Sequence, residues 1–80
     1  MTTMVKVPFD SGTARFDQDK LATALLVWLD AAGLEGQRRL AAVRNRLRDE
    51  HGIDAGEAIS LTVAARICDE RGIDPYASAA

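Results

Sequence analysis

Residues 21–32, LATALLVWLDAA, form the longest apolar run of the chain and contain its only tryptophan, Trp28. At about 100° per residue, the apolar side chains of this run cover well over half of a helix surface. Thr23 and Asp30 leave only a narrow polar stripe. A surface helix normally has a much narrower apolar face. We therefore expect this helix to be covered on several sides, by its own chain, by a second copy or by a partner.

The residues on either side of this run mark the ends of the predicted helix. Asp17 can accept hydrogen bonds from the free amides of a first helical turn, so the helix should begin beside it. Gly33 is expected to end the helix, because glycine adopts the left-handed conformation after a last turn without strain. The connection that follows is short, which predicts that the next helix runs antiparallel to the first.

Two further helices are predicted, at about residues 35–51 and over residues 55–71. The first of these has a narrow apolar seam of Leu40, Val43 and Leu47 with arginines on both sides. Since arginine stems cover apolar surface while their charged ends stay in water, this helix should lie outside, with one edge in the core. The helix over residues 55–71 is apolar on most of its surface. Its expected polar stripe consists of Thr62, Arg66 and Asp69.

One local pattern occurs twice. Residues 49–54, DEHGID, return almost unchanged as residues 69–74, DERGID. In each copy the glycine is expected to end a helix, the isoleucine to contact the last turn, and the aspartate to cap the next helix. After the second copy, Pro75 suits the first position of a helical turn, where no amide proton is needed. Two copies are too few for a solenoid.

The N-terminal residues have the only strand character in the chain. Val5, Val7 and Phe9 alternate with Lys6 and Pro8, and Asp-Ser-Gly at 10–12 is typical of a turn. The predicted fold is therefore mainly α. Residues 1–16 form an extended arm or a short β-hairpin, and residues 17–80 form a three-helix bundle with a short C-terminal helical turn, in a single domain.

The composition argues against several classes of protein. Cys68 is the only cysteine, so a disulfide within the chain is impossible and a cytoplasmic location is expected. His51 has no second histidine with which to share a metal, and the acidic residues gather at helix ends. We expect no metal, no cofactor and no catalytic site. The apolar run is shorter than the roughly 20 residues of a membrane span, so no membrane partner is expected.

Two groups of residues are candidates for partner binding. The apolar surface that a three-helix bundle leaves over should centre on Leu25, Trp28, Leu29, Ile59 and Val63. The basic candidates are Arg39, Arg44, Arg46 and Arg48. They come from residues 35–48, which hold five arginines and one acid although the whole chain has a net charge of −2. These arginines straddle the apolar seam, an arrangement that suits a solvated face or an acidic protein surface better than a phosphate backbone.

The leading functional hypothesis is a small non-catalytic protein–protein interaction module, such as a bacterial or phage adaptor, assembly factor or accessory subunit. It would self-associate or bind another protein through its excess apolar surface. The alternative is a small dimeric DNA-binding regulator that uses the arginine-rich helix. The order of one strand and two helices occurs in ribbon-helix-helix regulators, but Lys6 would be the only basic residue in the strand.

Overall fold

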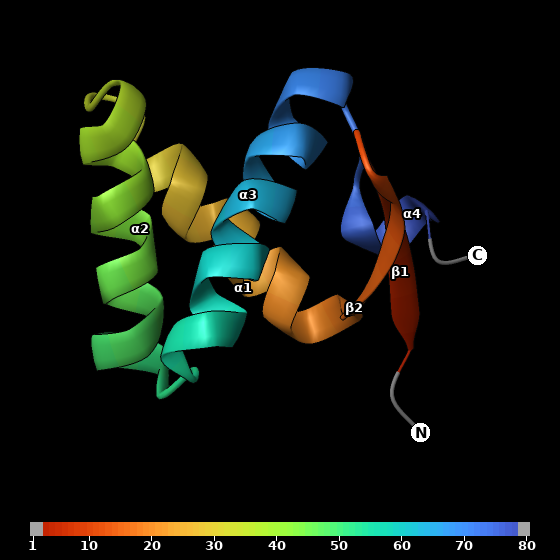
Figure 1. The fold of residues 1–80 in the computed structure, drawn as a ribbon, viewed down its shortest axis with the longest axis horizontal. Coiled ribbons are helices and arrows are strands. Elements are labelled where there is room, and N and C mark those ends of the chain that lie inside the picture. The colour runs from red at the N-terminus through yellow and green to blue at the C-terminus, as the bar shows by residue number, and fades with distance from the viewer. Residues whose placement is uncertain (1–2, 79–80) are drawn as a thin grey trace.

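The computed structural model describes residues 3–78, which form a β-hairpin, three helices and a short fourth helix (Figure 1). The elements are β1 (Met4–Phe9), β2 (Gly12–Asp17), α1 (Gln18–Asp30), α2 (Gly36–His51), α3 (Ala55–Arg71) and α4 (Pro75–Ser78). Figure 1 shows α2 and the hairpin at opposite ends of the molecule, with α1 and α3 between them. The mainly α fold is as predicted. No helix in the described part of the chain is long and apolar enough to cross a membrane.

The N-terminal residues form the hairpin rather than a free arm. β1 and β2 pair antiparallel, with Val5 opposite Phe16 and Val7 opposite Ala14. Val5 and Val7 are fully buried, whereas Lys6 between them is exposed. A lone two-stranded hairpin is only marginally stable in water. This hairpin is ordered because its two valines form part of the core that the helices share.

The start of α1 agrees with the sequence prediction. The carboxylate of Asp17 accepts a hydrogen bond of 3.0 Å from the backbone amide of Lys20. This bond satisfies one of the amides that have no partner inside the helix. The strand and the helix thus share Asp17 as their boundary.

The end of α1 differs from the prediction. The helix ends at Asp30, and Gly33 does not have a positive φ. The Ala32 amide bonds to the Leu29 carbonyl at 3.2 Å, whereas in a helix that continued to Gly33 it would bind the Trp28 carbonyl. That carbonyl instead accepts two hydrogen bonds from Arg39 of α2, at 2.7 and 3.1 Å. A side chain distant in sequence has therefore replaced the backbone amide that a longer helix would have supplied.

α2 lies on the outside of the molecule, as expected from its narrow apolar seam (Figure 1). Val43 and Leu47 are fully buried, and Leu40 packs against the core. The helix begins at Gly36, one residue later than predicted. It ends at His51, and the following residue, Gly52, has the left-handed φ of +64° that favours glycine.

The repeated DEHGID and DERGID segments act as helix ends in both places. Gly52 and Gly72 both follow their helices with a left-handed φ. Asp54 then accepts a hydrogen bond from the Gly56 amide, and Asp74 accepts one from the Tyr76 amide. Both pairs of caps follow the sequence prediction. α3 has the predicted bounds, and α4 supplies the short last turn.

The polar stripe predicted on α3 is wrong at Thr62. This side chain is 2% exposed, and its hydroxyl donates a hydrogen bond of 2.7 Å to the Ala58 carbonyl of the preceding turn. A threonine that satisfies its hydroxyl within its own helix needs no contact with water. The outward surface of α3 instead includes Ile59, which is 51% exposed.

Candidate functional site

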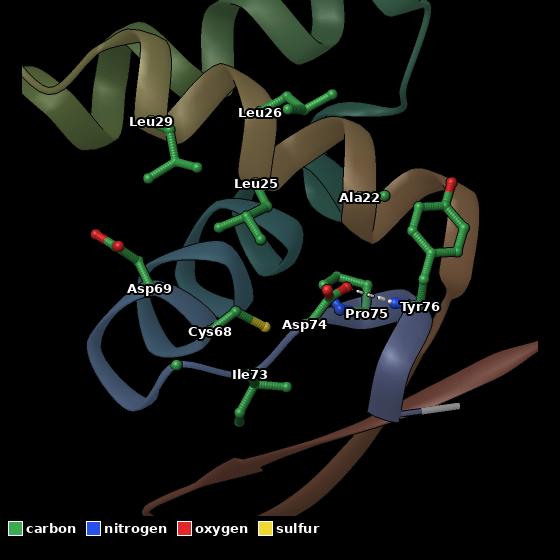
Figure 2. Close-up of a pocket in the computed structure, with 11 residues that line it drawn as sticks. Ala22, Leu25, Leu26, Leu29, Cys68, Asp69, Ile73, Asp74, Pro75 and Tyr76 are labelled. Carbon is green, nitrogen blue, oxygen red and sulfur yellow. Dashed lines mark hydrogen bonds between the residues drawn. The ribbon is translucent and has the colours of Figure 1, made fainter. Parts of the chain in front are cut away.

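The most distinctive surface feature is an apolar groove between α1 and the chain from the end of α3 to α4 (Figure 2). Its volume is about 370 Å³. We call it the α1–α4 groove. Its lining residues are Ala22, Leu25, Leu26 and Leu29 of α1, together with Cys68, Asp69, Gly72, Ile73, Asp74, Pro75 and Tyr76.

The α1 wall of the groove is a row of leucines. Leu25, Leu26 and Leu29 share one side of the helix, because residues three and four apart lie next to each other on a helix surface. Leu26 is 69% exposed and Leu29 46% exposed. Leu25 is half-buried and packs against the core. The apolar excess predicted for α1 is therefore present at its surface.

The opposite wall is built by the second DERGID segment and α4. The left-handed Gly72 turns the chain back after α3, and Ile73 packs against the core. Tyr76 stands at one end of the groove, where its hydroxyl donates a hydrogen bond of 3.2 Å to Asp19 at the start of α1. This hydrogen bond raises the pKa of Tyr76. Gln18 also donates to the Pro75 carbonyl at 3.3 Å, so two bonds hold α4 against α1.

The charged side chains that line the groove carry one sign. Among the described residues on its walls, only Asp69 and Asp74 are charged, and both are acids. Asp69 also accepts a hydrogen bond of 3.1 Å from the Trp28 indole Nε1. On the far side of Leu26 lies Arg46, whose guanidinium is paired with Asp30 at 2.8 Å and with Glu50 at 3.1 Å. The groove itself is therefore apolar and acidic.

Cys68 also lines this groove but is almost completely buried, at 1% exposed. Burial raises the pKa of its thiol, because a thiolate is poorly solvated there. A thiol with a raised pKa is a poor nucleophile at neutral pH. This environment is that of a structural cysteine.

The five apolar residues proposed from the sequence do not form one surface. Leu25 and Leu29 line the α1–α4 groove, whereas Ile59 and Val63 do not. Val63 is half-buried and lies beside the tip of the hairpin. Trp28 is only 5% exposed and belongs to the core. Helical spacing alone missed Leu26, the most exposed of the large apolar side chains that the structure describes.

Trp28 is covered by Arg39. The guanidinium carbon of Arg39 lies 3.7 Å from the centre of the indole ring, a cation–π arrangement. The same guanidinium group donates to the Trp28 carbonyl. Arg39 therefore joins α2 to the end of α1 and is engaged within the fold.

The remaining basic candidates also differ in their surroundings. Arg46 is held by Asp30 and Glu50, and Arg48 forms an ion pair with Asp49 at 3.1 Å. Arg44 is half-buried and has no ion pair within residues 3–78. The four arginines are thus not brought together as a single cationic surface by their contacts.

Within residues 3–78, no three histidine, cysteine, aspartate or glutamate side chains are grouped so that they could hold a metal ion. Comparison of the chain with protein-family models, with curated proteins and with solved structures gives no significant match. The α1–α4 groove and the charges around it are therefore the features of the described residues that point to a function.

Proposed function

We propose that this protein is a small non-catalytic interaction module that associates with another protein through the α1–α4 groove. The observation that carries the proposal is the exposure of Leu26 and Leu29 beside an apolar hollow. Burying one leucine side chain contributes about 1.5–3 kcal/mol. An exposed pair at the rim of a groove is therefore a strong potential source of binding energy, and adaptor, assembly-factor or accessory-subunit activity would follow from it.

The DNA-binding alternative has less support. Non-specific DNA affinity comes from cations that replace counterions on the phosphates. Three of the four candidate arginines already contact acids or Trp28 within the fold. Exposed ion pairs are weak and can be exchanged, but Arg39 would have to leave both the Trp28 ring and its carbonyl.

The lone, buried Cys68 supports a reducing compartment such as the cytoplasm.

The test is affinity capture from a lysate of the source organism, with and without nuclease. The wild-type protein is compared with the double variant Leu26→Gln, Leu29→Gln. The matched control is Ile59→Gln, which makes the same kind of apolar-to-amide change at a half-exposed site outside the groove. We expect a stoichiometric protein partner that survives nuclease, is lost with the double variant and is kept with the control.

Two results would contradict the proposal. Recovery that depends on nucleic acid would favour the regulator hypothesis, which a labelled duplex titrated with wild-type protein and with Arg44→Gln would then test. Equal recovery by the double variant and the wild type would mean that the groove is not the binding surface. Circular dichroism of each variant shows that a lost partner is not the result of lost folding.

A further inference from the structure

The chemistry of the groove indicates what kind of segment it binds. We infer that the α1–α4 groove binds a cationic amphipathic helix of a partner protein; this inference rests on the proposed function and makes its partner specific. First, the shape of the groove fits a helix. One wall is the leucine row of α1, and the other is the end of α3 with the turn into α4. An apolar trough beside a helix is the usual receptor for the apolar face of another helix.

Second, the acidic charges around the groove are complementary to a cationic helix. The only charged side chains among the described residues on the walls are Asp69 and Asp74. Asp19 adds a third carboxylate beside the groove through its hydrogen bond to Tyr76. Lysines or arginines flanking the apolar face of a bound helix would meet these acids. Acidic flanks would be repelled by them, and complementary charge selects among partners in this way.

A second copy of this chain is a poor occupant for the same reason. A twofold contact through the groove places the same surface against itself, so Asp69 and Asp74 would meet the acids of the other copy. The arginine-rich α2 does not offer an apolar face either, because its Val43 and Leu47 are fully buried in the core. The charges of the groove therefore favour a different protein.

Asp69 links an occupant of the groove to a spectroscopic signal. Its carboxylate accepts the indole N–H of Trp28, the only tryptophan of the chain. A cation that approaches Asp69 competes for this carboxylate and changes the field at the indole. Trp28 emission should consequently report occupation of the groove by a peptide that contains no tryptophan.

The experiment uses two synthetic peptides of about four helical turns. Both have leucines along one face; lysines fill the other face of the first peptide, and glutamates replace them in the second. Binding to the full-length protein is followed by Trp28 emission and by anisotropy of a labelled peptide, at low and high salt. We expect the lysine peptide to bind at least about tenfold more tightly than the glutamate peptide, and more weakly as salt rises.

Two double variants test whether the peptide binds in the α1–α4 groove. The double variant Leu26→Gln, Leu29→Gln removes apolar contacts and should weaken binding of the lysine peptide by about tenfold or more. The double variant Asp69→Asn, Asp74→Asn removes charge without changing shape, and each asparagine keeps an acceptor oxygen for Trp28 or for the cap of α4. It should weaken the lysine peptide, reduce its salt dependence and leave thermal stability nearly unchanged. Ile59→Gln is the control and should bind as the wild type does.

Equal affinity for both peptides would overturn the inference, as would equal weakening by Ile59→Gln and by the leucine variant. A dimer in sedimentation analysis that the leucine variant abolishes would mean that a second copy fills the groove. If the lysine peptide fails to bind while the leucine variant still loses a captured partner protein, the proposed function stands and only the cationic helix is wrong.

Discussion

At the level of single residues, Arg39 connects α2 to the end of α1 through several contacts. It covers the Trp28 ring, donates two hydrogen bonds to the carbonyl of that residue and thereby closes the end of α1. The sequence alone shows only its charge, which led to the prediction that Arg39 is part of a basic binding surface. In the folded protein it connects two helices.

Replacing Arg39 by alanine should lower the free energy of unfolding by about 1–3 kcal/mol. The change removes a cation–π contact and leaves the Trp28 carbonyl without its two donors. Urea unfolding measures the loss, and a red shift of Trp28 emission in the folded variant reports the uncovered ring. Arg38→Ala is the control, because it removes the same charge from an exposed neighbouring position. Equal losses for the two variants would mean that only the charge of the helix matters.

At the scale of elements, the helix ends follow two different rules. α2 and α3 are each followed by a glycine with a left-handed φ, Gly52 and Gly72, whereas α1 ends without a left-handed residue. Gly33 does not have a positive φ, and an added Cβ would meet no atom within 4 Å. The same amino acid is therefore required at one helix end and merely tolerated at another.

Alanine substitution separates these two cases. Gly52→Ala should destabilise the protein by about 1–2 kcal/mol, because an L-residue is strained at a left-handed φ. Gly33→Ala should be neutral or stabilise by up to about 1 kcal/mol, because it reduces the freedom of the unfolded chain without strain. Thermal unfolding followed by circular dichroism compares them. A loss of stability at Gly33 as large as that at Gly52 would contradict the assigned end of α1.

At the scale of the whole molecule, one core joins the hairpin to all three long helices. It contains Val5 and Val7 of β1, Leu21 of α1, Leu47 of α2 and Leu61 of α3, each at most 1% exposed. In a chain of this length the core is thin, so each buried side chain is a large share of the total stability. The hairpin therefore contributes to the same core as the three long helices.

Val7→Ala should therefore destabilise the entire protein, by about 2 kcal/mol, through the cavity that it leaves. Urea unfolding followed by far-ultraviolet circular dichroism, which reports the helices, and by Trp28 fluorescence should give one coincident transition for wild type and variant. Thr13→Ala, at an exposed position of the same hairpin, should change stability by less than about 0.5 kcal/mol. Unchanged helix stability in Val7→Ala would mean that the hairpin is a dispensable arm.

Four features could be predicted from the amino-acid sequence alone: the helical class, the bounds of α3, the Asp17 cap and the two helix ends followed by glycine. These features depend on interactions within a few residues, such as a carboxylate with a nearby amide or a glycine at a left-handed φ. They can be recognised in the chain without knowledge of its packing.

Which part of each wide apolar face is covered could not be predicted in this way, because it depends on how the elements pack together. Periodicity gives the width of that face, but burial depends on the neighbouring element that packs there. Trp28 is buried, and its ring is contacted by Arg39 of α2 and Asp69 of α3. Leu26, two residues earlier, is exposed beside the groove. The end of α1 was decided in the same way, because Arg39 lies eleven residues beyond the carbonyl that it binds.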